Sequence, residues 1–147
     1  GRPCTCGRRG CFEAYCSATA LIKRTRQVMQ EEKDSLLWQA AGDLEHVNGR
    51  VPFDAAALGD AAAGRVVDEY IEYLACGLAS LVNIFQPEVM CIGGGPSAQG
   101  ERLLAPVRYI LDQEDYARNN VRRTRLMGAS LGNDAGLIGA ALLPLFR

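Results

Sequence analysis

The sequence has no excess of charge of either sign and no long apolar run. Lys and Arg number 16 and Asp and Glu number 17, so the net formal charge is −1 over 147 residues. This balance excludes the strongly basic surface with which proteins hold nucleic acid, and we interpret the Arg-containing stretch 118–125 as a solvated loop before a strand. No apolar run approaches the roughly 20 residues that span a bilayer. We therefore expect no nucleic acid and no membrane among the partners.

Also absent are an initiator methionine and a leader of basic and then apolar residues. The chain opens with Gly1-Arg2-Pro3-Cys4, within a motif, and we expect it to be part of a longer protein. Its length suffices for one compact domain with its own core. We therefore treat residues 1–147 as a single domain fragment.

Cysteine is the residue type that stands out in this composition. Cys4, Cys6 and Cys11 lie within eight residues, together with two glycines that let the backbone fold back. Three thiolates at this spacing can bind a soft or borderline cation at three points. Zinc is such a cation, and it would require a fourth ligand. A disulfide or unrelated core thiols are the alternative, although Cys4 and Cys6 are too close in sequence to pair easily with each other.

The remaining cysteines and the only histidine supply no obvious fourth ligand. We interpret Cys16 as a buried thiol on the following helix and His46 as an exposed loop residue. Cys76 and Cys91 have apolar neighbours in the sequence, so we expect them to behave as small hydrophobes. Free thiols of this kind are typical of a reducing compartment, which predicts a cytoplasmic protein.

Hydrophobic periodicity and capping residues predict a helix-rich α/β chain. The expected helices cover residues 13–32, 36–41, 52–58, 61–85, 99–113 and 135–143, and the expected strands cover 88–92 and 124–129. Asp60 begins the longest helix and Asn133-Asp134 caps the last one. The second half of the longest helix is apolar nearly all round, so we expect it to be buried. Two strands are too few for a complete α/β sheet, and further strands are expected upstream of Gly1.

Three consecutive glycines follow the first expected strand. Gly93, Gly94 and Gly95 would let a ligand approach the backbone closely, and the N-terminus of the next helix is available to an anion. A tight turn between strand and helix explains the same triplet without any ligand. The glycines alone leave both interpretations open.

The run Cys-x-Cys-Gly-x-x-Gly-Cys-x-Glu at residues 4–13, followed by Ala-Tyr-Cys-Ser-Ala, resembles the signature sequence of the ROK (repressor, ORF, kinase) family. The family contains glucokinases, other hexose and N-acetylmannosamine kinases, and sugar-responsive repressors. The resemblance continues at 51–56, 59–60, 83–89, 92–95 and 132–136, and so covers essentially the whole chain.

The resemblance implies a ribonuclease-H-like fold of the actin and hexokinase type, of which this chain would be part of the C-terminal domain. It also implies a structural zinc held by Cys4, Cys6 and Cys11. The family's fourth ligand is a histidine upstream of the first cysteine, and this chain starts too late to contain it. The zinc would pin an irregular loop that has almost no core of its own.

Glu13 is the residue that the resemblance assigns to substrate, because the matching glutamate of the family contacts the hexose. It follows Cys11 by two positions, so the cysteine loop would fix its backbone at the start of a helix. A carboxylate is purely an acceptor and takes two hydrogen bonds from adjacent sugar hydroxyls. The alternative is an ordinary first-turn glutamate that the helix dipole stabilises.

For the glycine triplet, Gly93 to Gly95, the resemblance implies contact with the adenosine of ATP. The segment Gly132 to Gly136 could line the same cleft, but we favour close helix packing there. The family's catalytic aspartate and phosphate loops, which act with Mg²⁺, belong to the preceding region. The aspartates of this chain match caps and loops instead: Asp43, Asp54, Asp60 and Asp134. We therefore expect the chain alone to be inactive.

These expectations combine into one function and two alternatives. The favoured function is the C-terminal part of a homodimeric, ATP-dependent glucokinase that phosphorylates glucose or a related hexose at its 6-hydroxyl. The first alternative is the sugar-sensing body of a ROK-family repressor. The second is a zinc-loop domain without catalysis.

Overall fold

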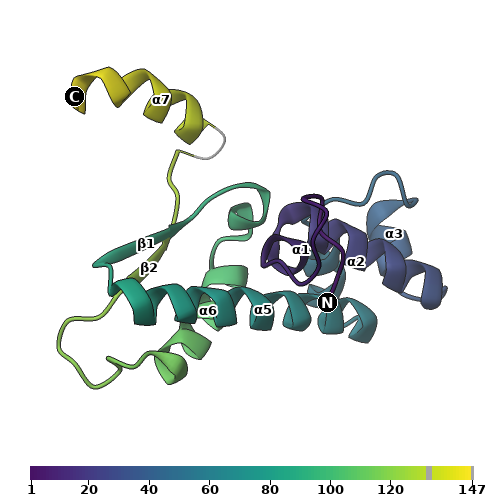
Figure 1. Cartoon of the computed structure of the whole chain (residues 1–147). Coiled ribbons are helices and arrows are strands. Elements are labelled where there is room, and N and C mark those ends of the chain that lie inside the picture. The colour runs from purple at the N-terminus through teal and green to yellow at the C-terminus, as the bar shows by residue number, and fades with distance from the viewer. Residues whose placement is uncertain (132–133, 147) are drawn as a thin grey trace.

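The structure is a computed structural model that describes residues 1–131 and 134–146 (Figure 1). The elements in chain order are α1 (Glu13–Cys16), α2 (Ala18–Glu31), α3 (Leu37–Ala41), α4 (Val51–Ala57), α5 (Ala61–Phe85), β1 (Val89–Ile92), the 3₁₀ helix η1 (Gly95–Gln99), α6 (Glu101–Glu114), β2 (Arg125–Gly128), α7 (Ala135–Leu142) and the 3₁₀ helix η3 (Leu143–Phe146). Among the described residues, no helix is both long enough and apolar enough to cross a bilayer.

The long helix α5 organises the fold because α2, α4 and α6 all pack against it. Its bounds are those that the sequence predicts. Asp60 caps the start, accepting a hydrogen bond from the backbone N–H of Ala63 at 2.6 Å. Gln86 ends it in the left-handed region, directly before Pro87. The core formed around this helix includes Leu21, Met29, Leu37, Ala63, Val66, Leu74, Ala75, Leu103 and Val107, all of them almost fully buried.

The two strands pair in parallel, with Val89 opposite Arg125 and Ile92 opposite Gly128. α6 is the crossover between them, and Arg108 of α6 donates a hydrogen bond to the carbonyl of Leu126 at 3.1 Å. Parallel strands are usually covered on both faces. Here the side chains of Val89 and Met127 are 39% and 46% exposed, so the face away from α6 is open. Within the described residues the sheet has no third strand, as the sequence predicts.

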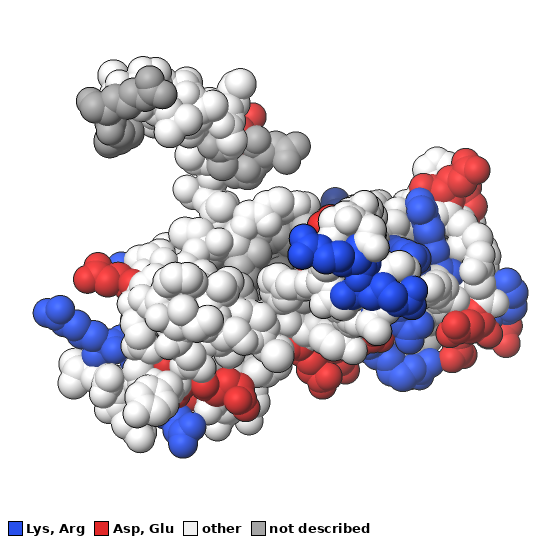
Figure 2. Space-filling view, viewed as in Figure 1, with Lys and Arg blue, Asp and Glu red and all other residues white. Residues whose placement is uncertain are grey.

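Two expectations about burial are wrong. The second half of α5 is not buried all round, since Ile84 and Phe85 are each 70% exposed. Cys76 and Cys91 are exposed as well, although their sequence neighbours are apolar. Within the described residues no segment covers the side chains of Ile84, Phe85 and Cys91. Cys76 lines an open groove with Ile110 and Glu114 of α6. Figure 2 shows this part of the molecule as a broad surface almost without charge.

Two predicted helices differ from the structure by more than a one-residue shift of a boundary. The helix expected over 13–32 is divided at Ser17, whose extended backbone ends α1 and whose hydroxyl caps α2 through the N–H of Ala20 at 3.0 Å. The helix expected over 99–113 begins at Glu101, after the 3₁₀ turn of η1.

The predicted last helix is present as α7. In Figure 1 it stands away from the other helices. Of its predicted cap, Asn133 lies outside the described residues, and Asp134 makes no side-chain cap bond.

Candidate functional site

The cysteine loop, residues 1–12, folds back on itself through a short backbone bridge. Pro3 and Arg9 pair as an isolated antiparallel bridge, and the N–H of Cys4 donates to the carbonyl of Arg8 at 2.9 Å. Gly7 and Gly10 have φ values of 83° and 76°, a left-handed conformation in which a side chain would be strained. The two glycines therefore allow the reversal that brings the three thiols together.

The Sγ atoms of Cys4, Cys6 and Cys11 all lie within 4.8 Å of one another. Those of Cys6 and Cys11 are 3.6 Å apart, and none of the three forms a disulfide. Sulfurs bound to one tetrahedral zinc at about 2.3 Å are spaced by about 3.8 Å. The three thiols thus fit a zinc-sized cation with little movement, which is the arrangement that the sequence predicts.

The thiols differ in acidity because they share hydrogen bonds. The backbone hydrogen bond involving Arg8, with contacts from Cys4 and Cys11, lowers the pKa of Cys6 to about 7. The hydrogen bond with Cys6 raises the pKa of Cys11 to about 11, and Cys4 adds to this effect. Cys6 therefore ionises much more readily than Cys11, and near neutral pH about half of the Cys6 side chains are thiolate. A cation must displace the remaining protons to take all three ligands.

No fourth ligand joins the cluster from the described part of the chain. Cys16 is half-buried, and burial raises its pKa to about 12, as expected for an inert helix thiol. His46 is exposed in its loop, where its Nδ1 lies 2.8 Å from Asp43. His46 is exposed as the sequence predicts, whereas Cys16 lies on a helix as predicted but is only partly buried.

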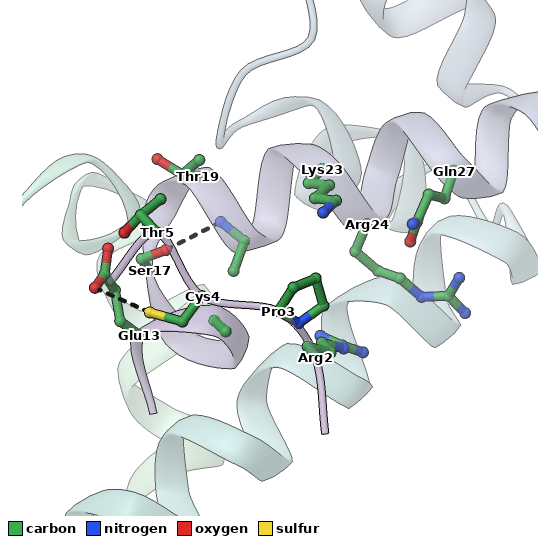
Figure 3. A pocket seen from close by; sticks show the side chains of 12 residues that line it. Arg2, Pro3, Cys4, Thr5, Glu13, Ser17, Thr19, Lys23, Arg24 and Gln27 are labelled. Atoms are coloured by element: carbon green, nitrogen blue, oxygen red, sulfur yellow. Dashed lines mark hydrogen bonds between the residues drawn. The ribbon is translucent and has the colours of Figure 1, made fainter. Parts of the chain in front are cut away.

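Glu13 begins α1 directly after the cysteine loop. Its Oε2 lies 3.8 Å from Sγ of Cys4, and Figure 3 shows the two side chains pointing toward each other. α1 is four residues long, too short for a substantial helix dipole, which weakens the interpretation of Glu13 as a glutamate held by the dipole alone. The structure thus brings Glu13 and the predicted metal ligands into one site.

An open cavity of about 180 Å³ lies beside this pair. Cys4, Glu13 and Ser17 line one end, and Lys23, Arg24 and Gln27 of α2 line the other (Figure 3). Its walls combine a carboxylate and hydroxyls with apolar atoms, a mixture that suits a small polar ligand. The Lys and Arg side chains that gather over this region in Figure 2 make the surroundings cationic.

Four residues that the sequence patterns do not single out hold the loop on α5. Arg2 forms an ion pair with Glu69, and its guanidinium lies 4.7 Å from the ring centroid of Tyr15. Tyr15 in turn packs on Tyr73 of α5. The sequence indicates this arrangement only through the spacing of Glu69 and Tyr73, which are four residues apart and therefore lie on one face of α5.

The glycine triplet forms the turn between β1 and η1. Gly94 has a φ of 81°, and a Cβ added at Gly94 or Gly95 would meet no atom within 4 Å. At Gly93 the nearest atom would be Cβ of Ala129, at 3.7 Å. The backbone is therefore open to a close approach by a ligand, although none of the three glycines lines the cavity beside Glu13. The helix that follows starts with the acidic Glu101, which makes its N-terminus less favourable for an anion than expected.

The structure describes only part of the segment Gly132 to Gly136, for which we expect close helix packing. Gly132 and Asn133 lie outside the described residues. At Gly136, in α7, an added Cβ would meet no described atom within 4 Å. The close helix packing predicted for this segment is therefore not found at Gly136.

The parallel strand pair with its crossover helix, preceded by a thiol loop on a long helix, is part of an α/β domain, and its similarity to solved ROK kinases identifies this domain as one of the actin and hexokinase type. A sequence model of the ROK family matches residues 1–145. The chain belongs to the ROK family. The resemblance noted in the sequence is thereby confirmed.

Three similar proteins illustrate the range of the family. The glucokinase of Thermotoga maritima is 38% identical over 142 residues, which cover 96% of this chain and 44% of that protein. A ROK family glucokinase from Streptomyces griseus, solved in complex with glucose and AMPPNP, has a TM-score of 0.83 and 32% identity over 97% of this chain and 47% of its own. A xylose repressor of Caldicellulosiruptor bescii is 29% identical over 77% of this chain and 28% of its own length. The chain thus spans less than half the length of these relatives and corresponds, for the glucokinases, to their C-terminal part.

Proposed function

We propose that this chain is the sugar-recognising, C-terminal part of an ATP-dependent glucokinase, with glucose or a related hexose as its substrate. The observation that carries the proposal is the position of the Glu13 carboxylate, beside the thiol cluster and at the edge of the open cavity. A carboxylate held there accepts hydrogen bonds from two adjacent sugar hydroxyls. The similarity to a glucokinase solved with glucose and AMPPNP supports the same assignment.

We assign Cys4, Cys6 and Cys11 to a structural zinc. Their spacing and free thiols fit this cation, and its role would be to fix the loop that leads into Glu13. The role of the metal would be structural, because a structural zinc takes no part in phosphoryl transfer.

The adenosine of ATP is assigned to the turn of Gly93, Gly94 and Gly95, whose open backbone suits a close ligand contact. The Mg²⁺ that accompanies ATP would be bound outside the described residues, with the phosphates. Phosphoryl transfer also needs a base for the sugar hydroxyl. Asp43 and Asp60 instead accept hydrogen bonds within their own loop or cap, and Asp54 pairs with Arg102. We therefore propose that the chain binds sugar without phosphorylating it.

The test is a titration of the 147-residue chain with glucose, followed by ligand-observed NMR or calorimetry. Glu13→Gln keeps the size of the side chain and removes its charge. A hydrogen bond to a charged group contributes about 1.5–3 kcal/mol, so each bond lost should weaken glucose binding by about tenfold or more. Glu72→Gln, at an exposed carboxylate on α5, is the matched control and should bind as the parent chain does. Equal glucose affinity in both variants would reject the role of Glu13.

The alternative is the sugar-sensing body of a ROK repressor, which the similarity to a xylose repressor favours. The two functions differ in their need for a nucleotide. A kinase requires an adenosine site, whereas a repressor body requires only the sugar. Titration with AMPPNP therefore separates them: saturable binding supports the kinase, and sugar binding without AMPPNP binding supports the repressor.

We also propose that the chain forms a homodimer. The exposed apolar residues at the end of α5, Ile84 and Phe85, are compatible with burial in such an interface. Sedimentation of the parent chain and of Ile84→Glu tests this assignment, since a charge in the interface should lower the dimer fraction.

A further inference from the structure

Gly77 lies in the interior of α5, where a glycine has no obvious purpose. Its φ is negative, so the backbone does not require glycine there. After proline, glycine is the least favourable residue for a helix interior. A glycine in this position is explained where a neighbouring group occupies the space that a side chain would fill.

The occupant is the ring of Phe12. A Cβ built on Gly77 would lie 2.0 Å from Cε2 of Phe12, 2.3 Å from its Cζ and 2.7 Å from its Cδ2. These distances are far inside van der Waals contact, so the ring rests directly on the backbone of α5. The other glycine in the interior of the helix, Gly64, has no atom within 4 Å of the equivalent position.

Phe12 is the residue between Cys11, a proposed metal ligand, and Glu13, the proposed sugar ligand. A contact that fixes Phe12 therefore fixes the backbone on which both functional side chains stand. No larger core supports this part of the loop, since neither Cys11 nor Glu13 is buried. Besides the hydrogen bonds that the carbonyl of Phe12 accepts from the N–H groups of Tyr15 and Cys16, the contact of its ring with α5 is what holds this residue, which is 46% exposed.

Gly77 continues a row of contacts along one face of α5. Glu69, Tyr73 and Gly77 are spaced by four residues and so lie one above another, and we call them the support stripe. Glu69 pairs with Arg2, Tyr73 packs on Tyr15, and Gly77 meets Phe12. Each successive turn of the helix thus holds a different part of the segment that carries the thiols.

We propose that Gly77 is a positioning residue, whose missing side chain seats Phe12 and thereby sets Cys11 and Glu13 in their working places. The part of this inference that concerns Glu13 rests on the proposed function. The part that concerns Cys11 rests only on metal binding by the three thiols.

The test compares Gly77→Ala with Gly64→Ala in the 147-residue chain. Both substitutions add one methyl group to the interior of the same helix, but only the first removes the seat of Phe12. Cobalt(II) is the probe, because its thiolate absorption bands report both affinity and ligand geometry. Loss of a group that orients metal ligands usually weakens metal binding by about 10–100-fold. We expect Gly77→Ala to lose at least about tenfold in cobalt affinity with altered bands, and Gly64→Ala to behave as the parent chain.

A double-variant cycle makes the inference specific to this contact. Phe12→Ala removes the ring, after which there is room for a methyl group at position 77. Phe12→Ala combined with Gly77→Ala should therefore bind cobalt within about twofold of Phe12→Ala alone. If the Gly77→Ala chain fails to fold, circular dichroism replaces cobalt binding as the readout. The double variant should then regain the helical signal that Gly77→Ala lacks, because the ring has been removed.

Three outcomes would overturn the proposal. They are equal cobalt affinity in the Gly77→Ala and Gly64→Ala chains, losses that multiply in the double variant, and a double variant that remains unfolded. Glucose affinity is measured separately on the same samples. A chain that follows the expected cobalt pattern but binds no glucose would overturn the proposed function and leave the seating of Phe12 intact.

Discussion

The ring of Tyr15 packs against the ring of Tyr73, with centroids 4.7 Å apart and planes inclined by 55°. The guanidinium of Arg2 lies over both rings, 4.7 Å and 5.3 Å from their centroids. This stack joins the first residues of the chain to the middle of α5 through contacts that involve no metal. The cysteine loop is thus docked on the helix at one end by aromatic and cationic side chains, and at the other end by Phe12.

Replacement of Tyr73 by alanine should loosen the loop without unfolding the helices. Aromatic pairs contribute about 0.5–1.5 kcal/mol beyond the area that they bury, and the cation over the ring adds to this. We expect the free energy that holds the loop closed to fall by about 1–2 kcal/mol. Hydrogen exchange at the N–H groups of Cys4 and Gly10, which donate to carbonyls within the loop, measures the change.

The control is Tyr109→Ala, since Tyr109 is 69% exposed on α6. Its substitution should leave exchange in the loop unchanged. Similar exchange in the parent chain and in Tyr73→Ala would show that the aromatic stack does not hold the loop.

Asp60 should contribute more to stability than other carboxylates of α5. Its carboxylate accepts hydrogen bonds from the N–H groups of Ala63 and Leu36, each at 2.6 Å, and so caps α5 while fixing the turn before α3. Loss of an N-cap costs about 0.5–2 kcal/mol, and we expect Asp60→Ala to lie at the upper end of this range. Urea unfolding followed by circular dichroism measures it. Asp68→Ala, at an exposed position of the same helix, should change stability little.

The contribution of Asp60 should also depend on pH in a defined direction. Partial burial acts to raise the pKa of this carboxyl, but the hydrogen bonds from Ala63, Leu36 and Ser35 outweigh it and lower the pKa below its ordinary value. A lowered pKa in the folded state stabilises the fold above the pKa of the unfolded chain, and this gain is lost as the pH falls through the folded-state pKa. The difference in unfolding free energy between the parent and Asp60→Asn should therefore be full at pH 7 and smaller at pH 3. A difference that grows on acidification would contradict the assignment.

The thiols of the metal-free chain should react at very different rates. Hydrogen bonds from Arg8, Cys4 and Cys11 lower the pKa of Cys6 to about 7, and the side chain is exposed. Burial raises the pKa of Cys16 to about 12. Because the thiolate is the nucleophile, iodoacetamide should modify Cys6 with a rate that rises between about pH 6 and pH 8, while Cys16 stays largely unmodified. Mass mapping after short pulses measures both rates, and equal modification of the two would refute the expected order.

Much of the fold follows from local sequence, and α5 shows why. Asp60 caps its start and Pro87 lies just beyond its end, so both bounds follow from residues at the boundary itself. The convergence of Cys4, Cys6 and Cys11 is also local, since two glycines reverse the chain between them. Features set within a few residues were therefore accessible to prediction.

The break at Ser17 is local as well, yet it was missed. Apolar periodicity continues across it and predicts one uninterrupted helix, whereas the local signal for the break is the capping hydroxyl of Ser17.

The features that could not be predicted depend on contacts distant in sequence. Nothing near Phe12 indicates that its ring rests on Gly77, and nothing near Arg2 indicates Glu69 as its partner. The exposure of Ile84 and Phe85 escaped prediction for a related reason: hydrophobicity says that a side chain favours burial, but not whether a neighbour is present to cover it.

The pairing of β1 with β2 leaves each strand with an outer edge that no described strand occupies. An edge of this kind carries a row of backbone donors and acceptors at the spacing of a sheet, and it is a ready template for another strand. These edges are therefore able to pair with a further strand from another segment or another molecule. In solution, a peptide that supplies a matching strand should raise the solubility of the chain, and high concentration without one should favour aggregation through the same edges.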